Sequence, residues 1–502
     1  MSHSARPYLT GLLAALAFCW ISIWNGYPLV YEDTLSYLER PATAAAATAG
    51  IDSEWANHAK LSRVGITVAT ASHAGPATPP AAKGYDSTFK SGRSIYYGIP
   101  AYLLSLVGGL WAVVAAQAVL LSIVLALLWY RCLGLTSNGG FAVLIGAMAV
   151  ATSAGLFVNL VMPDLLGGLL ILSLSMLLAF WGRLGRSDRI FLAAAATLAV
   201  VAHDSHLALG VAVVAGAALV ARLIPARWRE GISGPALGTG ALVVVIGVVA
   251  SVAFGVAVKS VTGQPPARLP HLTAHLVGKP VLAEFLATNC EGASPAWAVC
   301  AYRARLPLVW TSFLFESRPG IGTFATSGSH HKLAISEQDM PLMLAVLRAR
   351  PAETIMMMLD DAALQLASFS YDDLAPREKA NYIDHNFPPS VRSAVHASRL
   401  WQDSRPLSFL SVVEQVGVVV ALPAFVLALY VLRRRGRADG RGVAVLGGLI
   451  IAGVVANAFI CGGLASPYDR FQARVVWLIP LLAIIAIAAL IFPAPATTTR
   501  EP

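Results

Sequence analysis

The sequence predicts an all-α polytopic membrane protein: a bundle of about ten transmembrane helices with a smaller, mainly helical domain on its outer face. Of the 502 residues, 57% are hydrophobic and 13% are charged, and the mean hydropathy is +0.66. A water-soluble globule cannot bury that much apolar surface. The apolar residues also form runs long enough to cross ~30 Å of hydrocarbon at ~1.5 Å per residue. These two observations define the class.

The apolar runs place the spans in order along the chain. The first run ends in aromatic residues and lacks a small-residue cleavage site, which predicts a retained helix and not a signal peptide. The expected spans are Leu9–Tyr27, Leu110–Arg131, Phe141–Val158, Asp164–Trp181, Ile190–His203, His206–Leu223, Leu237–Val258, Phe409–Val431, Val443–Cys461 and Arg474–Ile491.

The spans divide the chain into three parts. Residues 1–258 are expected to hold seven spans and a first outer loop at 29–109, and residues 259–408 to form an outer-face domain. Residues 409–502 would hold three spans and a cytoplasmic tail. Within the outer-face domain, Ser336–Phe369 is expected to be a helix that lies on the membrane or caps the bundle.

Arginine clusters in the short connections indicate the orientation. They fall on one side of the predicted membrane, which by the positive-inside rule is the cytoplasm. Both termini are then expected on the cytoplasmic side of a bacterial inner membrane. The net charge of +9 is mostly explained by this asymmetry, so no nucleic-acid partner is expected. The clusters are Arg183, Arg186 and Arg189; Arg222, Arg227 and Arg229; and Arg433, Arg434, Arg435, Arg437 and Arg441.

Cysteine use agrees with this orientation. Cys290 and Cys300 bracket a short polar segment of the outer-face domain, where an oxidising compartment such as a periplasm favours a disulfide between them. The alternative is two free thiols. Cys19, Cys132 and Cys461 lie in predicted spans or at their ends. Two cysteines without nearby paired ligands are weak support for zinc.

The first candidates for chemistry are Glu32 and Asp33, an acidic pair just past the outer end of the first span. Two adjacent carboxylates beside hydrocarbon are costly unless they face water, a cation or a reacting group. The Ala-, Thr-, Gly- and Pro-rich stretch that follows them is expected to be an irregular surface excursion.

The segment His203-Asp204-Ser205-His206 interrupts a long apolar stretch. Only about 14 residues, roughly 21 Å of helix, precede it after Arg189, so the turn is expected below the outer headgroup plane. Polar groups at that depth line a cavity or are buried in protein. His203, Asp204 and His206 are therefore candidates to bind a phosphate or a divalent cation. The alternative is that they hydrogen-bond a tight hairpin.

Asp164 follows Pro163 at the start of another predicted span. An acidic residue there is favoured by the unpaired amides and the helix dipole, which would explain it without a function. The functional alternative is that Asp164 faces the same outer cavity as Asp33 and helps to fix a substrate or a cation.

Basic residues flank two other outer connections. Lys90 and Arg93 lie shortly before Tyr96, and Arg470 and Arg474 lie just before the last span. Arginines beside aromatic residues are common interfacial anchors. The alternative is that these side chains hold a lipid phosphate, for which the guanidinium fork is well suited.

The order of these motifs resembles the C-type glycosyltransferases, polytopic membrane enzymes that use polyprenyl-phosphate sugars. The resemblance rests on Glu32-Asp33 in the first outer loop, on Arg93-Ser94-Ile95-Tyr96-Tyr97-Gly98 leading into the second span, and on Pro163-Asp164. It covers the first half of the chain in motifs and the second half in topology. It implies that Asp33 is a general base or metal contact with Glu32 as its neighbour, and that Asp164 assists. The second outer loop has no clear Asp-x-Asp pair, so dependence on a divalent cation stays open.

The predicted activity is transfer of a sugar from a polyprenyl-phosphate donor to an envelope glycan, lipid or protein acceptor on the outer face. Such a transfer needs a carboxylate base for the acceptor hydroxyl and a cationic cradle for the phosphate. Asp33 would be the base, and Lys90, Arg93 or Arg470 the cradle. A donor of this kind needs no nucleotide, in agreement with the lack of a P-loop or Gly-rich dinucleotide motif.

Two other classes stay open. A lipid or solute transporter or flippase is expected to show internal repeats, broken central helices and short outer loops. A non-enzymatic envelope assembly protein would use its outer domain for protein contacts and would tolerate replacement of Glu32 and Asp33. A shared site requires Asp33, Asp164, His203 and Arg470 to converge. Arg470 should then lie within about 20–24 Å, two helix diameters, of Asp33.

Overall fold

The chain is helical in the part that the structure describes. The computed structural model describes residues 6–58, 93–223, 232–291, 296–318, 321–435 and 439–492. Within these ranges the backbone forms helices and connecting segments, and the β-type contact is a parallel bridge between Leu29 and Leu160. The prediction of an all-α protein built on membrane-length apolar helices is confirmed.

Among the described residues, 8 helical stretches are long and apolar enough to cross a membrane. The bent pair α6 (Asn138–Ala151) and α7 (Ser153–Asn159), with an angle of 73°, raises the number to 9 if it is one span. The remaining predicted span falls on α9 (Arg186–Ala202), which has only 17 residues. The stretches are α1 (Arg6–Phe18) with α2 (Trp20–Asn25), α5 (Ile95–Leu127) with η1 (Leu128–Cys132), α8 (Asp164–Phe180) with η2 (Trp181–Arg183), α10 (Asp204–Leu223), α11 (Gly234–Thr262), α20 (Arg405–Arg434), α21 (Asp439–Ala458) with η7 (Phe459–Gly463), and α22 (Asp469–Val476) with α23 (Leu478–Ile491).

Helix α8 lies at the centre of the bundle. All 17 of its residues are buried, and it packs against α9, α10, α21 and α22. Gly168 permits a close approach: a Cβ there would lie 2.5 Å from Nε1 of Trp477, at the junction of α22 and α23. Because α8 begins at Asp164, the carboxylate of this residue lies at the end of the apolar core.

Two buried amide side chains hold the turn before α8. Asn159 accepts a hydrogen bond from the backbone of α2 (3.0 Å) and donates one to the last carbonyl of α1 (2.7 Å). Gln117 in α5 donates to the carbonyl oxygens of Val158 and Leu160, at 2.9 and 3.0 Å. The turn is therefore fixed against two other spans, and so is the position of Asp164.

The segment predicted as the first outer loop begins as helix α3 (Glu32–Ala49), with Glu32 and Asp33 in its first turn, where the helix dipole favours carboxylates. The expectation of an irregular chain is wrong for residues 41–49, because alanine is the strongest helix former, and residues 59–92 of that stretch lie outside the described ones. Thr34 accepts a hydrogen bond from the backbone of Tyr31 (3.0 Å) and donates one to the carbonyl of Val161 (3.0 Å). These bonds join the start of α3 to the turn before α8.

Helix α3 packs against the start of α5. A Cβ at Gly98 would lie 2.6 Å from the carbonyl oxygen of Tyr37, so only glycine allows this approach. Ser94 caps α5 by accepting a hydrogen bond from the backbone of Tyr96 (3.1 Å). Arg93 lies immediately before this cap and beside the first turn of α3.

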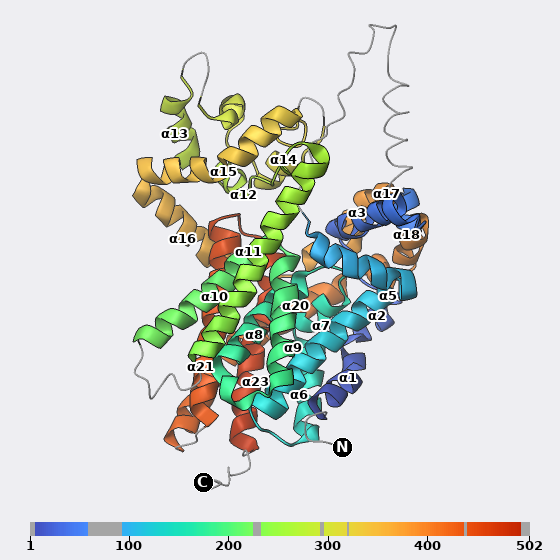
Figure 1. Ribbon diagram of the computed structural model, residues 1–502, viewed down its shortest axis with the longest axis vertical. Helices are drawn as coiled ribbons and strands as arrows, with labels where there is room; N and C mark the ends of the chain where they lie inside the picture. Colours follow the sequence, from blue (N-terminus) through green and yellow to red (C-terminus); the bar gives the residue numbers. More distant parts are fainter. Residues whose placement is uncertain are drawn as a thin grey trace.

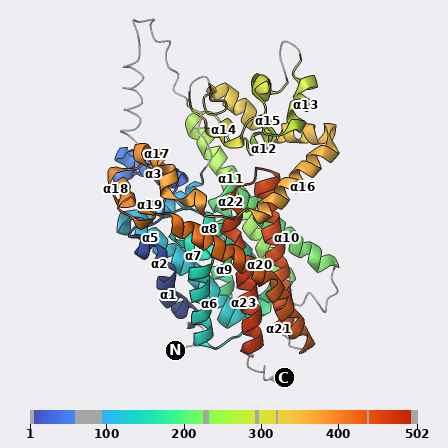
Figure 2. The ribbon, with the colours of Figure 1, turned by 180° about the vertical axis from the view of Figure 1, so that it is seen from behind.

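The helices beyond the bundle form two groups, which lie on opposite sides of α11 (Figures 1 and 2). One group packs around a hydrophobic core of its own, and the other packs with α3 into the main core. Residues 259–408, predicted as one outer-face domain, thus divide between two cores. We call the two groups the first and second outer groups, after the outer-face domain predicted for these residues. The first outer group has α12 (His271–Leu276), α13 (Pro280–Asn289), η4 (Ala298–Arg305), α14 (Trp310–Phe315), α15 (Ser329–Ala349) and α16 (Pro351–Ala367); the second outer group has η5 (Asp372–Leu374), η6 (Pro376–Lys379), α17 (Ala380–Asn386), α18 (Pro389–His396) and α19 (Arg399–Gln402).

The stretch Ser336–Phe369, predicted as one helix, is broken at Arg350. The residue before a proline is disfavoured in the helical region, and Arg350 precedes Pro351 with φ −140° and ψ 67°. The break separates α15 from α16, so that α16 turns toward the bundle.

Helix α16 connects the first outer group to the end of the bundle. A Cβ at Gly462 would lie 2.7 Å from the carbonyl oxygen of Asp361, so η7 and α16 are in close backbone contact. Gln365 donates a hydrogen bond to the backbone carbonyl of Tyr468 (2.9 Å) and accepts one from its backbone N–H (2.8 Å). The first outer group is therefore attached to the segment that leads into α22.

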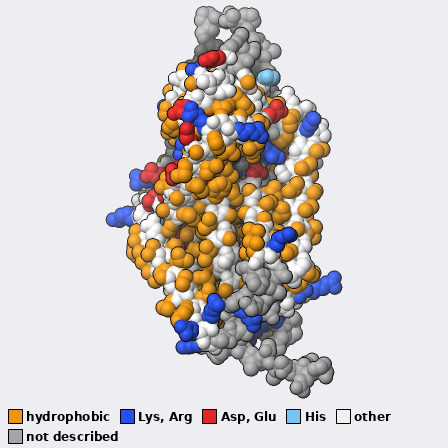
Figure 3. Space-filling model, turned by 90° about the vertical axis from the view of Figure 1, so that its left-hand side faces the viewer, with side chains coloured by type: hydrophobic (Ala, Val, Ile, Leu, Met, Phe, Trp, Pro, Cys, Tyr) orange, Lys and Arg blue, Asp and Glu red, His pale blue; other side chains and the backbone are white. Residues whose placement is uncertain are grey.

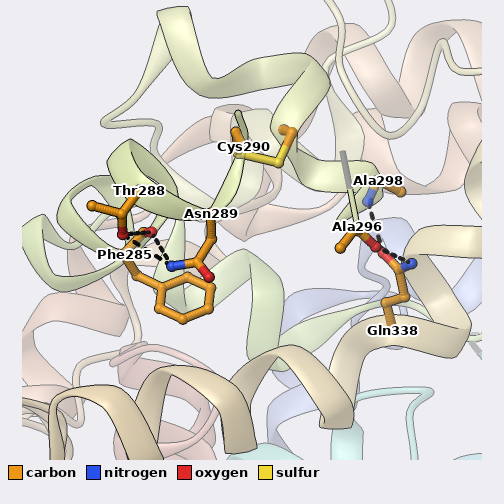
Figure 4. The surroundings of a disulfide bond; sticks show 8 residues. Phe285, Thr288, Asn289, Cys290, Ala296, Ala298 and Gln338 are labelled. Carbon is orange, nitrogen blue, oxygen red and sulfur yellow. Dashed lines mark hydrogen bonds between the residues drawn. A yellow bond between two sulfur atoms is a disulfide. The ribbon is translucent and has the colours of Figure 1, made fainter. Parts of the chain in front are cut away.

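Cys290, at the end of α13, and Cys300 of η4 form a disulfide with a Cα–Cα distance of 5.7 Å (Figure 4). The predicted pairing is confirmed. Nearby, Asn289 donates to a backbone carbonyl of α13 (2.8 Å), and Gln338 of α15 accepts from the backbone of Ala298 (2.7 Å). The disulfide and these bonds join three elements of the first outer group.

Reducing this disulfide, or replacing both cysteines with serine, is expected to lower the stability of the first outer group by about 2–3 kcal/mol, because a short closed loop restricts the unfolded chain modestly. Tryptophan fluorescence during thermal unfolding of the full-length protein measures the change. Cys19→Ser is the matched control and should have little effect. Mass spectrometry that finds both outer thiols free in protein from intact membranes would contradict the pairing.

The outer surface of the helices is apolar over a broad area. Figure 3 shows hydrophobic side chains across the middle of one face, Lys and Arg toward its lower end, and acidic and basic side chains together above. Valines of α11 are exposed in the same way, including Val248, Val252 and Val256. Apolar surface of this extent requires a lipid environment, so the chain is an integral membrane protein.

Candidate functional site

Asp33 lies between two arginines at the end of the bundle core. Its Oδ1 accepts a hydrogen bond from Nη2 of Arg93, and its Oδ2 lies 3.4 Å from Nη2 of Arg470. The side chains of Asp33 and Arg93 are each 18% exposed, and that of Arg470 is 9% exposed. Ion pairs shielded in this way are screened far less than surface pairs. One carboxylate thus joins α3, the start of α5 and α22.

Arg470 also faces Asp164. Its Nε lies 3.7 Å from Oδ1 of Asp164, and its Cζ lies 4.4 Å from the ring centroid of Tyr31. Stacking on an aromatic face orients a guanidinium and stabilises its charge. Nε and Nη1 of Arg470 are buried and have no hydrogen-bond partner among the described residues. The side chain is therefore well oriented while two of its donor atoms stay available.

The adjacent carboxylates Glu32 and Asp33 differ electrostatically. Burial raises the pKa of Asp33, but attraction to Arg93 and Arg470 outweighs it, and the pKa lies below its usual value. Burial raises the pKa of Glu32 above its usual value, although Lys379 opposes the shift. Within the described ranges, no hydrogen bond or ion pair engages the Glu32 carboxylate. Asp33 stays ionised within its pairs, whereas the oxygens of Glu32 are free to meet a ligand.

A further acidic residue, Asp373 of η5, lies next to Tyr31. It accepts a hydrogen bond from the Tyr31 hydroxyl (2.6 Å) and forms an ion pair with Nζ of Lys379 (2.8 Å). The Tyr31 hydroxyl also lies 3.1 Å from the hydroxyl of Tyr468. The second outer group therefore contributes charged side chains to the same site.

Arg474 lies one turn after Arg470, so both extend from the same face of α22. Its Nη2 donates to Ser205 and Asn457, each at 3.0 Å, and to the sulfur of Cys461 at 3.1 Å. All three partners are neutral, and its buried Nε has no hydrogen-bond partner in the described part of the chain. A buried guanidinium in neutral surroundings attracts an anion.

His203 and His206 are both used in the turn between α9 and α10. Nδ1 of His203 accepts a hydrogen bond from the backbone of Ser205 (3.2 Å), which caps α10. Nδ1 of His206 lies 2.8 Å from the carbonyl oxygen of Ala199, and its ring is fully buried beside Gly167 of α8. The hydrogen-bonded hairpin considered for this segment is therefore present.

A narrow pocket opens between the start of α5, the α9–α10 turn and α11, with a cavity volume of about 50 Å³. Its polar lining residues are Arg93, Ser94, Tyr96, His203, Asp204, Ser251 and Arg268. Arg93 thus contacts Asp33 and also borders this pocket.

A wider pocket, of about 550 Å³, lies between the first turn of α3 and η6–α17. Its lining residues are Glu32, Glu378, Lys379, Asn381, Tyr382, His385 and Asn386. All of these side chains carry groups that can donate or accept hydrogen bonds. We call it the α17 pocket.

The structure brings most of the predicted site residues together. Arg470 and Asp33 are 3.4 Å apart, far inside the distance that a shared site requires. Asp164 joins them through Arg470, and His203 shares the narrow pocket with Arg93. The other members are Glu32 in the α17 pocket, Tyr96 and Asp204 in the narrow pocket, and His206 and Arg474 beside Gly167. Lys90 lies outside the described residues.

The described residues offer arginines and not a metal-ligand cluster at this site. In those ranges, no three His, Cys, Asp or Glu side chains gather as a metal ion would require. Arg470 contacts both Asp33 and Asp164, so a guanidinium bridges the two carboxylates that a cation would bridge.

Four residues of the site, Tyr31, Asp373, Lys379 and Tyr382, are not predicted from the sequence. A signal for three of them was present. Tyr371-Asp372-Asp373 repeats the order aromatic, acid, acid of Tyr31-Glu32-Asp33, and a lysine follows six residues later.

No family model, curated protein or solved structure matches the chain. The fold and the site define a class on their own: an integral membrane protein with a buried cluster of carboxylates and arginines at one end of its apolar bundle.

Proposed function

We propose that this protein is a membrane glycosyltransferase that moves a sugar from a polyprenyl-phosphate donor to an acceptor on the outer face. The observation that carries the proposal is the cluster of Asp33, Arg93, Arg470 and Asp164. Asp33 and Arg470 lie in the first turns of α3 and α22, Asp164 begins α8, and Arg93 precedes α5. All four therefore meet where the apolar bundle borders polar segments.

The cluster favours a phosphate as its ligand. Arg470 has two buried donor atoms without hydrogen-bond partners among the described residues, and the hydrogen-bond partners of Arg474 there are all neutral. Charge-assisted hydrogen bonds from guanidinium to phosphate oxygens are strong and directional. A phosphate would satisfy these donors while Asp33 and Asp164 keep the guanidinium groups in place.

The surroundings of Arg93 suit a phosphate that is attached to a lipid. The narrow pocket beside Arg93 is walled by α11, whose valines Val248 and Val252 are exposed on the apolar surface. A polyprenyl chain cannot leave hydrocarbon cheaply, and a phosphate cannot be buried there without cations. A donor at this edge keeps its chain in the bilayer and its phosphate at the arginines.

The proposed step is a displacement at the anomeric carbon of the sugar. The acceptor hydroxyl gives its proton to a carboxylate of the Glu32–Asp33 pair, and its oxygen bonds to the anomeric carbon. The bond from that carbon to the phosphate oxygen breaks, and its electron pair stays on the phosphate. Arg93 and Arg470 stabilise the negative charge that develops on the leaving polyprenyl phosphate.

We also propose an orientation for the protein in the bacterial inner membrane. The start of α1 and the end of α23 lie at the same end of the bundle, opposite α3, α17 and the first outer group (Figure 1). Arg183, Arg433 and Arg434 lie at helix ends that the positive-inside rule assigns to the cytoplasm. The cluster then faces the outer side.

Release of polyprenyl phosphate tests the proposal. The purified protein in lipid nanodiscs, supplied with a panel of polyprenyl-phosphate hexoses and pentoses and a cell-envelope extract as acceptor, should release it from at least one donor. Arg405→Ala serves as the control, because it removes a basic side chain that is 90% exposed. This variant should release polyprenyl phosphate as the wild type does. No release from any donor, together with no cross-linking to a photoreactive polyprenyl phosphate, would reject the proposal.

A further inference from the structure

We infer that the α17 pocket binds a carbohydrate, and that Glu32 contacts the sugar hydroxyl that acts as acceptor. The lining of the pocket indicates the class of ligand, whereas the acceptor role rests on the proposed function. The pocket volume of about 550 Å³ falls in the range of small-ligand sites, roughly 300–1,000 Å³.

The lining of the α17 pocket matches a neutral polyhydroxylated ligand. It presents two carboxylates, two amides, an ammonium, an imidazole and a phenol, which together donate and accept hydrogen bonds in many directions. Every side chain that lines it in the described chain is polar or aromatic, so a lipid tail would leave these groups unpaired. Glu32 and Glu378 outnumber Lys379, which disfavours an anionic ligand.

Several of the lining side chains are held in place. Lys379 is fixed by Asp373 at 2.8 Å, and Asn386 donates to the backbone carbonyl of Tyr382 at 2.9 Å. The ring of Tyr382 packs edge-to-face with Phe387, with centroids 6.4 Å apart. A fixed aromatic ring offers a flat surface for the C–H face of a sugar, and a preformed pocket binds at a lower entropic cost.

The geometry separates the roles of the two adjacent carboxylates. Asp33 is held by Arg93 and Arg470, whereas Glu32 lines the pocket without a hydrogen-bond or ion-pair partner in the described residues. A proton acceptor must reach the hydroxyl with a free lone pair, which Glu32 can do. The proton passes from the sugar hydroxyl to Glu32 as the oxygen bonds to the donor's anomeric carbon. The electron pair of the broken bond goes to the phosphate at the arginines.

The electrostatic surroundings of Glu32 support this role. Burial raises its pKa, Lys379 and Arg470 oppose the shift, and Asp33 and Asp373 reinforce it. A base with a raised pKa is protonated at moderately acidic pH, so the transfer rate should increase as pH rises through the pKa of Glu32. The charged and titratable groups that face Glu32 are Asp33 of α3, Asp373 of η5, Glu378 and Lys379 of η6, Tyr382 and His385 of α17, and Arg470 of α22.

Carbohydrate binding can be measured apart from transfer, on an array of neutral and charged oligosaccharides with the protein in nanodiscs. We expect the protein to bind neutral sugars, and we expect Tyr382→Ala and Asn381→Ala each to weaken this binding about tenfold or more. The side chain of Asn381 is exposed, so its replacement should leave the fold intact. Glu32→Gln should keep sugar binding within about threefold, because an amide still hydrogen-bonds a hydroxyl, and should lower transfer by about 10²-fold or more. In Glu32→Gln, the decrease of the transfer rate toward acidic pH (the acid limb of the pH profile) should also disappear.

Glu337→Gln removes an exposed carboxylate of α15 and is the matched control for Glu32→Gln. No binding to any neutral oligosaccharide, or sugar binding unchanged in both α17 variants, would overturn the carbohydrate assignment. Normal transfer in Glu32→Gln would overturn the acceptor contact. Cross-linking to photoreactive polyprenyl phosphate tests the donor separately: if sugar binds and the lipid does not, the proposed function fails and the carbohydrate pocket stands.

Discussion

Asp33→Asn is expected to lower turnover by about 10²-fold or more, because an amide cannot neutralise the two guanidinium groups that Asp33 holds. Removing one partner of a shielded ion pair costs roughly 3–5 kcal/mol, and here Arg93 and Arg470 share the partner. Donor binding should weaken together with turnover. The acid limb of the pH profile should persist, since Glu32 is unchanged. Steady-state kinetics with the polyprenyl-phosphate donor in nanodiscs measures all three.

Asp403→Asn is the control for this substitution. Asp403 pairs with Arg405 on the surface, where an exposed ion pair contributes little, and its loss should leave turnover unchanged. Wild-type turnover of Asp33→Asn at normal membrane levels would remove Asp33 from the site.

Arg470→Glu is expected to weaken donor binding by about 10²-fold or more, with a smaller effect on the rate of the bound donor. The new carboxylate would stand between Asp33 and Asp164, so three like charges would repel each other and the phosphate. Titration with photoreactive polyprenyl phosphate measures binding, and single-turnover kinetics measures the bound-state rate.

Two further variants make this result specific. Arg470→Lys keeps the charge but loses the fork, so donor affinity should fall between those of the wild type and Arg470→Glu. Arg405→Glu changes an exposed charge and should leave donor affinity unchanged. Unchanged donor affinity in Arg470→Glu would show that the phosphate binds elsewhere.

The spans, and the end of the bundle at which their connections meet, could be predicted from the hydrophobic pattern of the sequence. Apolar runs of fixed length force the outer connections to one end of the bundle, so the meeting of Asp33, Asp164 and Arg470 follows from the order of spans. The break at Arg350 before Pro351 shows that a local backbone restriction overrides the hydrophobic pattern of residues 336–369.

The partners of the site could not be predicted in the same way. The contact of Tyr31 with Asp373 joins residues 342 positions apart. This pairing depends on how α3 and η5 pack, and the shared order aromatic, acid, acid in the two segments does not show that they meet. For the same reason, the different surroundings of Glu32 and Asp33 cannot be read from two adjacent acidic letters.

The chain order of the site matters for how the protein is made. Asp33 and Arg93 are synthesised well before Tyr468 and Arg470, which lie at the start of α22. Gln365 of α16 hydrogen-bonds the backbone of Tyr468, so the contacts of α16 are complete only after the segment leading into α22 has been synthesised. A nascent chain that has not yet inserted α22 and α23 therefore lacks the arginine that joins Asp33 to Asp164. Insertion of α22 and α23 is the step that completes the cluster.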